Sequence, residues 1–325
     1  MSTDTLIANL NLPEEAERIY AAEDLGFAND LAGITPLCDR LRVEPSRAVK
    51  ETIITALGRI RHYQVVAELA ALLQNDDPFI CNQAVQLMVG WGAAAFPKIE
   101  DILSKGDDHA RKLALDALGG IQVPGVEKLY RMALQDPNPN IVITAVEHIG
   151  LNAIKSLKGE MERIFKEVQE PMLLTAVLET LCLMGDADSL NLILERFQDI
   201  SAAPEMLQYS IIKALGLLGD SRHAPRVIGL LQTGHERLAQ PVVDALISLR
   251  ARVSSPPWPE DFLNPLLGAL NRNIADVLRY QILALLWQGQ HGAELKKRLD
   301  VEVQRLKDPE LLQALGEQMN KPCAL

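Results

Sequence analysis

One glycine-rich stretch has the spacing of a phosphate-binding loop. Gly90-Trp91-Gly92-Ala93-Ala94-Ala95 fits the form G-x-G-x-x-A, and Asp107-Asp108 follows at a distance that would suit a ribose contact. A dinucleotide site needs this motif between a parallel strand and a helix, in a βαβ unit. The surrounding sequence predicts helical repeats instead, so we interpret these glycines as a tight turn between paired helices.

The cysteines and histidines form no pattern typical of a metal or nucleophilic site. Cys38, Cys81, Cys182 and Cys323 lie far apart without a C-x-x-C pair, which predicts reduced thiols in a chain of this size. Asp107-Asp108-His109 fits a helix N-cap better than a catalytic group. We therefore predict no catalytic residue, no metal ligand and no cofactor.

Charge and composition narrow the classes of partner. The chain of 325 residues has 32 basic and 43 acidic residues, a net charge of −11, and no clear Lys/Arg stripe. Phosphate backbones and anionic membranes repel such a surface, so we expect neither nucleic acid nor membrane as a partner. The amino-terminal residues lack the features of a secretory signal, and no apolar run approaches the roughly 20 residues of a membrane span. These observations predict a cytoplasmic protein.

A short motif recurs along the chain and predicts the fold. Triplets related to Ala214-Leu215-Gly216 recur at intervals of 30 to 34 residues, with one longer interval of 39. Periods of this size indicate a solenoid of small supersecondary units. The third residue of each triplet is called its anchor. The anchors are Gly26, Gly58, Val89, Gly119, Gly150, Cys182, Gly216, Ile247 and Leu286.

Prolines follow the same period and predict where helices begin. Proline is tolerated in the first helical turn, where its missing N–H would have no partner. Each repeat is therefore predicted as a helix that ends at the anchor, a short turn and a second helix. About nine such pairs make a single solenoid over 1–325, regular over about 13–253, with a non-helical insertion at 254–260 and a C-terminal repeat with capping helices at 261–325. The prolines ahead of helical stretches are Pro45, Pro78, Pro139, Pro171 and Pro204.

The motif resembles HEAT repeats. The resemblance is carried by Tyr20-Ala21-Ala22-Glu23-Asp24-Leu25-Gly26 and by the segment from Ala214 to Arg222, and it covers about residues 13–307. The repeats are most similar to the short bacterial HEAT-like repeats of the phycobilisome-lyase type. The resemblance implies an all-α solenoid, or superhelix. It implies little about function, because packing residues make up the motif.

HEAT-like proteins are mostly scaffolds, and a minority are lyases, hydroxylases or DNA glycosylases. The di-iron hydroxylases use several His-Glu pairs, whereas this chain has the single pair His235-Glu236. The glycosylases line a groove with basic residues, whereas charges such as Glu162 and Arg163 alternate here. We therefore expect a non-catalytic protein-binding scaffold or adaptor. A phycobilin-lyase-like or chaperone-like subunit that acts with a partner protein remains the alternative, and a DNA-repair glycosylase is less supported.

The second helix of each repeat is predicted to line a concave surface, and its exposed positions are the candidate partner-binding residues. Small or apolar pairs alternate there with charged pairs, as expected of a protein-binding groove. One candidate lies elsewhere, in the proline-rich insertion, because loops often carry recognition. The candidates are Asp39, Ala70, Ala71, Arg131, Glu162, Arg163, Glu195, Ile228 and Trp258.

Overall fold

The structure is a computed structural model that describes residues 1–233, 236–250, 260–271, 274–287 and 293–319. Within these residues every regular element is a helix, which confirms the predicted all-α solenoid class. The helices form two compact units, Met1–Leu157 and Lys158–Leu325. Residues 254–259 of the expected insertion lie outside the described residues, and Glu260 begins a helix.

The first unit is a stack of ten α-helices with short 3-10 turns between some of them. Its helices are α1 (Thr3–Asn9), α2 (Glu15–Ala28), α3 (Ile34–Val43), α4 (Arg47–Arg59), α5 (Gln64–Leu72), α6 (Pro78–Trp91), α7 (Phe96–Lys105), α8 (Asp108–Gly120), α9 (Glu127–Ala133) and α10 (Pro139–Leu151). Its 3-10 turns are η1 (Leu31–Gly33), η2 (Gly92–Ala95) and η3 (Lys155–Leu157).

The second unit also consists of ten described α-helices with 3-10 turns between some of them. Its helices are α11 (Lys158–Glu167), α12 (Pro171–Met184), α13 (Ala187–Arg196), α14 (Glu205–Leu218), α15 (Ala224–Thr233), α16 (Ala239–Arg250), α17 (Glu260–Leu270), α18 (Asp276–Trp287), α19 (Ala293–Val303) and α20 (Pro309–Met319). Its 3-10 turns are η4 (Ile200–Ala202), η5 (Ser221–His223) and η6 (Glu236–Leu238).

All nine predicted anchors lie near the carboxyl ends of even-numbered helices, from Gly26 on α2 to Leu286 on α18. The residue before each anchor is buried, which confirms that the motif consists of core residues. These buried residues are Leu25, Leu57, Met88, Leu118, Ile149, Leu181, Leu215, Leu246 and Leu285.

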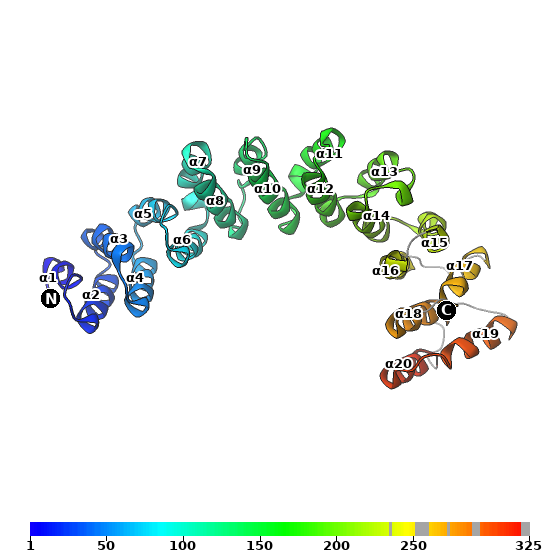
Figure 1. The fold of residues 1–325 in the computed structure, drawn as a ribbon. Coiled ribbons are helices and arrows are strands. Elements are labelled where there is room, and N and C mark those ends of the chain that lie inside the picture. The colour runs from blue at the N-terminus through cyan, green and yellow to red at the C-terminus, as the bar shows by residue number, and fades with distance from the viewer. Residues whose placement is uncertain (234–235, 251–259, 272–273, 288–292, 320–325) are drawn as a thin grey trace. The chain divides into compact units, whose positions relative to one another are not determined.

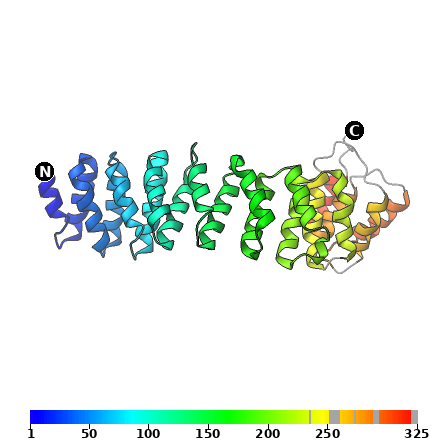
Figure 2. The same ribbon diagram turned by 90° about the horizontal axis from the view of Figure 1, so that it is seen from above.

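Within each unit the helices form two rows (Figures 1 and 2), here called the odd row and the even row after the numbers of their helices. In the second unit the even row lies on the inner side of the curve (Figure 1). The prediction that the second helix of each repeat lines the concave surface is therefore wrong for this unit. Gly216 lets α14 and α16 approach closely, and the row with closer helices becomes the inner one.

The pairing within a repeat also differs from the prediction. Among helices adjacent in the sequence, an odd helix lies closer to the even helix that follows it than to the even helix before it, as in α5 with α6 and α7 with α8. The Asp-Pro turn between α5 and α6 is strongly capped: the Asp77 carboxylate accepts the Phe79 N–H at 2.9 Å and lies 2.5 Å from the Lys50 ammonium. The compact hairpin thus spans this turn and not the anchor.

The segment Pro78–Lys105 is long enough and apolar enough to cross a bilayer, judged by length and composition alone. In the structure, 33 % of its most apolar window is buried. The sequence prediction had found no such run. The structure breaks the segment at Gly92, whose φ of 57° separates α6 from η2. This break confirms the predicted turn between helices at Gly92, whereas Gly90 belongs to the last turn of α6.

A polar side chain near the start of several even helices holds the end of the preceding segment. The Arg111 guanidinium donates to the Gly106 carbonyl at 2.8 Å and to both oxygens of Asp136 at 2.7 and 3.0 Å. Gln208 takes this position on α14 and donates to the Ala203 carbonyl at 2.8 Å. These contacts satisfy carbonyls that a helix end leaves without partners.

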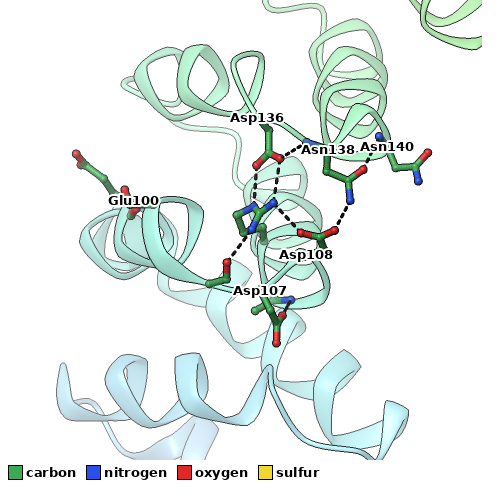
Figure 3. Close-up of polar contacts among 10 residues, drawn as sticks. Glu100, Asp107, Asp108, Asp136, Asn138 and Asn140 are labelled. Atoms are coloured by element: carbon green, nitrogen blue, oxygen red, sulfur yellow. Dashed lines mark hydrogen bonds and ion pairs between the residues drawn. The ribbon is translucent and has the colours of Figure 1, made fainter.

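Acidic and amide side chains extend this arrangement at the start of α8 (Figure 3). Asp107 caps the helix by accepting the Ala110 N–H at 2.7 Å, which confirms its predicted N-cap role. Asp108 accepts the Asn138 side-chain amide at 2.5 Å, and Asn138 in turn caps α10. The acidic residues around Asp136 are therefore helix caps and ion-pair partners.

Candidate protein-binding surface

The predicted partner-binding residues that the structure describes all lie on the odd row, one or two to a helix. Asp39, Ala71, Arg131, Arg163 and Glu195 are exposed, and Ala70 and Glu162 are half-buried.

Several of the charged candidates pair with a residue of their own helix. Asp39 lies 2.6 Å from Arg42, and Arg163 lies 2.9 Å from Glu167. Solvent-exposed pairs of this kind contribute little to stability and are typical of a solvated surface.

One predicted contact residue is in the core. Ile228 is only 1 % exposed, because α15 packs against both α16 and α17 and needs an apolar stripe wide enough for two neighbours. Cys38, which precedes the exposed Asp39, is buried for a similar reason, since α3 packs on α4 and α5. Trp258 and His235 lie outside the described residues.

Sequence reasoning missed the apolar side chains that the even row leaves in solvent. Most large exposed apolar residues of the described helices belong to that row, whereas the odd-numbered helices carry Val43 and Val301. A sequence signal existed, because the residue directly after the anchor is apolar in several repeats, as at Leu183 and Leu217. The exposed apolar residues of the even row are Tyr20, Phe27, Leu151, Met172, Leu183, Met206, Tyr209, Ile247 and Val277.

The even row contains two places where neighbouring helices come closest. A Cβ at Gly26 would lie 2.7 Å from the Ala56 Cα, and a Cβ at Gly216 would lie 2.7 Å from the Ala245 Cα. Glycine at the anchor and alanine two residues before the next anchor allow this approach. These two contacts are called the α2/α4 seam and the α14/α16 seam.

A groove lies over each seam. The α14/α16 groove has a volume of about 130 Å³ and is lined by Tyr209, Lys213, Gly216, Leu217, Pro241, Asp244, Ala245 and Ser248. The α2/α4 groove has a volume of about 350 Å³ and is lined by Glu23, Ala48, Glu51, Thr52, Thr55 and Arg59. The first has apolar walls and the second has polar ones.

Charges around the α14/α16 groove are partly neutralised. The Lys213 ammonium lies 2.5 Å from Glu179 on α12, and this hydrogen bond raises the pKa of Lys213. Asp244 accepts the Gln240 side-chain amide at 2.8 Å, and in the described part of the chain no cation pairs with it. The groove therefore keeps one carboxylate available for a cationic group.

The described thiols are unsuited to nucleophilic chemistry. Burial raises the pKa of Cys38 and of Cys182 to about 12, and burial also raises the pKa of Cys81. A thiol with a raised pKa stays protonated at neutral pH, and the thiolate is the reactive form. Within the residues described, no three His, Cys, Asp or Glu side chains form a group that could hold a metal.

Comparison with known proteins identifies the repeats. Residues 3–90 match the protein family described as HEAT repeats. No curated protein sequence matches the chain. Among solved structures, the chain is similar to the complex of CpcE and CpcF of phycocyanin lyase from Nostoc sp. PCC7120, with a TM-score of 0.30, 17 % identity, and coverage of 78 % of this chain and 95 % of that one.

The chain is also similar to two further solved structures. Importin beta is similar with a TM-score of 0.49 and 12 % identity over 98 % of this chain and 49 % of that one. The TSC2 N-terminus is similar with a TM-score of 0.39 and 11 % identity over 98 % of this chain and 99 % of that one. Residues 3–90 therefore resemble HEAT repeats, and the described helices of each unit belong to the all-α solenoid class.

Proposed function

We propose that this chain is a non-catalytic scaffold that binds one or more protein partners through the even row. The observation that supports the proposal is the set of exposed apolar side chains on α12 and α14. Met172 and Met206 occupy the same position relative to their anchors and are 61 % and 50 % exposed, and Tyr209 is 53 % exposed. Exposed apolar side chains that cluster on one face are typical of protein interaction sites.

The surroundings of these residues resemble the rim of a protein interface. Leu183 is 52 % exposed at the carboxyl end of α12, and the Glu179–Lys213 pair lies between the two helices. An apolar centre with a polar rim is the usual composition of such surfaces. The long exposed side chains of Met and Tyr also adapt to partners of different shape.

Proteins are favoured over nucleic acids and membranes as partners by the distribution of charge. Many basic residues of the described surface pair with carboxylates, as in Lys213 with Glu179 and Arg163 with Glu167. Binding to a phosphate backbone needs unpaired basic residues that can replace its counterions. Together with the net charge of −11, this pairing supports a protein partner.

A cross-linking experiment with matched variants tests the proposal. The even-row variant replaces Met172, Leu183 and Met206 with Ser, and the odd-row variant replaces Asp39, Arg131 and Glu195 with Ala. The full chain and both variants are expressed in the native host and cross-linked, and the partners are identified by mass spectrometry. We expect the even-row variant to lose the cross-linked partners while the odd-row variant keeps them. Retention by the even-row variant, with unchanged circular dichroism, would contradict the proposal.

A further inference from the structure

The α14/α16 groove has the dimensions of a site for one side chain. Its volume is about 130 Å³, and apolar cavities of about 150 Å³ accept a molecule of the size of benzene. Gly216 and Ala245 belong to the lining of the groove, and the two helices are in close contact there, since a Cβ at Gly216 would lie 2.7 Å from the Ala245 Cα. The volume of the groove over this contact is suited to one Leu, Met or Phe side chain from another molecule.

The walls of the groove are apolar and belong to two rigid helices. Leu217 and Pro241 line it together with Tyr209, whose side chain stands 53 % exposed at its edge. The backbones beneath are fixed by core residues, because Leu215 and Leu246 are both fully buried. An apolar side chain entering the groove would remove the exposed surface of Tyr209 from water at little conformational cost.

The charged residues at the rim of the groove favour a partner with a cationic group. Lys213 is held by Glu179 at 2.5 Å, whereas Asp244 has only the neutral Gln240 amide as its side-chain partner in the part of the chain that the structure describes. A cation placed beside Asp244 would gain a charge-assisted hydrogen bond. The net charge of −11 also attracts basic segments over longer distances.

From these observations we infer that the α14/α16 groove binds a segment of a partner protein that inserts one apolar side chain and places a Lys or Arg side chain against Asp244. The inference rests on the proposed scaffold function and names the chemistry of the partner. The α2/α4 groove does not share this specificity, because Thr55 occupies the position of Asp244, and Glu51 and Thr52 replace Gln240 and Pro241.

Selection of peptides on the full-length chain tests the inference. A displayed library of random 15-residue peptides is selected on the immobilised protein, and the selected peptides are measured by fluorescence anisotropy. We expect them to be enriched in a Lys or Arg within one helical turn of a Leu, Met or Phe. Asp244→Lys should weaken their binding at least tenfold and Tyr209→Ala about fivefold, whereas the matched variant Thr55→Lys should leave it unchanged.

The conservative variant separates charge from folding. Asp244→Asn keeps the size of the side chain and should reduce the salt dependence of binding that the wild-type protein shows. Hydrogen exchange of α14 and α16 checks that the variants are folded. Selected peptides without basic residues, or peptides that bind Asp244→Lys and Tyr209→Ala as tightly as wild type, would overturn the inference, as would a selection that yields no binder.

The outcome distinguishes the inference from the scaffold function. One outcome is that the groove variants leave the affinity of the peptides unchanged while the even-row variant of Met172, Leu183 and Met206 abolishes binding. In that case the inference fails and the scaffold proposal stands. If the native partners also remain cross-linked to the even-row variant, both fail.

Discussion

The α2/α4 and α14/α16 seams are built alike and yet carry different surfaces. In each, an anchor glycine faces the alanine two residues before the next anchor, and the hypothetical Cβ-to-Cα distance is 2.7 Å in both. At α8 and α10, by contrast, His148 takes the place of that alanine and its ring lies against Gly119. Two small residues thus decide how closely two even helices approach.

The side chains around the seams differ because they contribute nothing to the close approach. Glu23, Glu51 and Arg59 line the first groove, whereas Tyr209, Leu217 and Pro241 line the second. In the first unit Arg59 also lies over one face of the Phe27 ring, 4.3 Å from its centroid, and the Phe27 side chain stays exposed. The comparison shows that one backbone arrangement can present either a polar or an apolar groove.

The largest effect on both seams is expected from removing the leucine before the anchor. Leu25 and Leu215 are fully buried at equivalent positions. Leu25→Ala and Leu215→Ala should each lower the free energy of unfolding by about 2–5 kcal/mol, because each leaves a cavity. Denaturant unfolding followed by circular dichroism measures the change. A variant with an unchanged transition would show that the equivalence of the two seams is wrong.

Replacing the seam glycines with alanine should destabilise the protein less than the Leu→Ala variants do. The same replacement at glycines in open space should have the opposite effect. Gly26→Ala and Gly216→Ala are expected to destabilise the protein by about 1–3 kcal/mol, because the new Cβ meets a backbone atom that cannot move aside. Hydrogen exchange of the helices on either side of each seam should accelerate. Gly90→Ala and Gly159→Ala are matched controls in open space, and they should stabilise their helices by about 0.5–1 kcal/mol.

The seam between α8 and α10 supplies the contrasting case. A Cβ at Gly119 would lie 2.4 Å from the His148 ring, which is a side chain and can rotate toward solvent. Gly119→Ala should therefore cost less than about 1 kcal/mol, which is less than Gly26→Ala. Equal losses for the two variants would mean that His148 is as rigid as the backbone of Ala56.

Acid should reveal a difference between the units that hold the two seams. In the first unit, burial disfavours the Glu44 carboxylate, but hydrogen bonds from Arg18 and Arg40 hold its pKa below the usual value, and Lys50 lowers the pKa of Asp77. Such groups stabilise the fold above their unfolded pKa of about 4, and this stability is lost as the pH falls through the lower folded pKa. We expect the midpoint temperature of thermal unfolding of the first unit to decrease as the pH is lowered from 5 to 2.

We expect acid to lower the midpoint temperature of unfolding of the second unit by a smaller amount. Lys158 lowers the pKa of Asp186, and Arg222 lowers the pKa of Asp220 to about 2, but both carboxylates are exposed or half-exposed at turns and are screened by water. The fluorescence of Trp91 reports the first unit when Trp258 and Trp287 are replaced by Phe. Trp287 reports the second in the complementary variant. An equal or larger acid shift in the second unit would contradict this prediction.

The smallest effects are expected from the side chains that line the grooves. Tyr209→Ala removes an exposed side chain and Glu23→Ala a half-buried one, and each should change the free energy of unfolding by less than about 0.5 kcal/mol. Denaturant unfolding measures both. A larger loss for Tyr209→Ala would show that its ring stabilises the α14/α16 seam and is less free for a partner.

Much of the fold was predictable because local sequence decides it. The anchors, the buried residue before each, the caps at Asp107 and Asp77 and the turn at Gly92 follow from patterns within a few residues. The candidate surface was less predictable. Ile228 was expected in solvent but is buried, because α15 contacts two other helices and sequence periodicity reports the width of an apolar stripe only roughly.

The sequence by itself determined the period and the ends of the helices, because glycine and proline act through sterics within one or two turns. Only the tertiary structure decided that odd helices pair with the even helices that follow, and that the even row of the second unit lies inside its curve. It also decided which apolar residues stay exposed, such as Met172 and Tyr209. Burial depends on the distance and tilt of neighbouring helices, which are set by contacts between residues about thirty positions apart in the sequence.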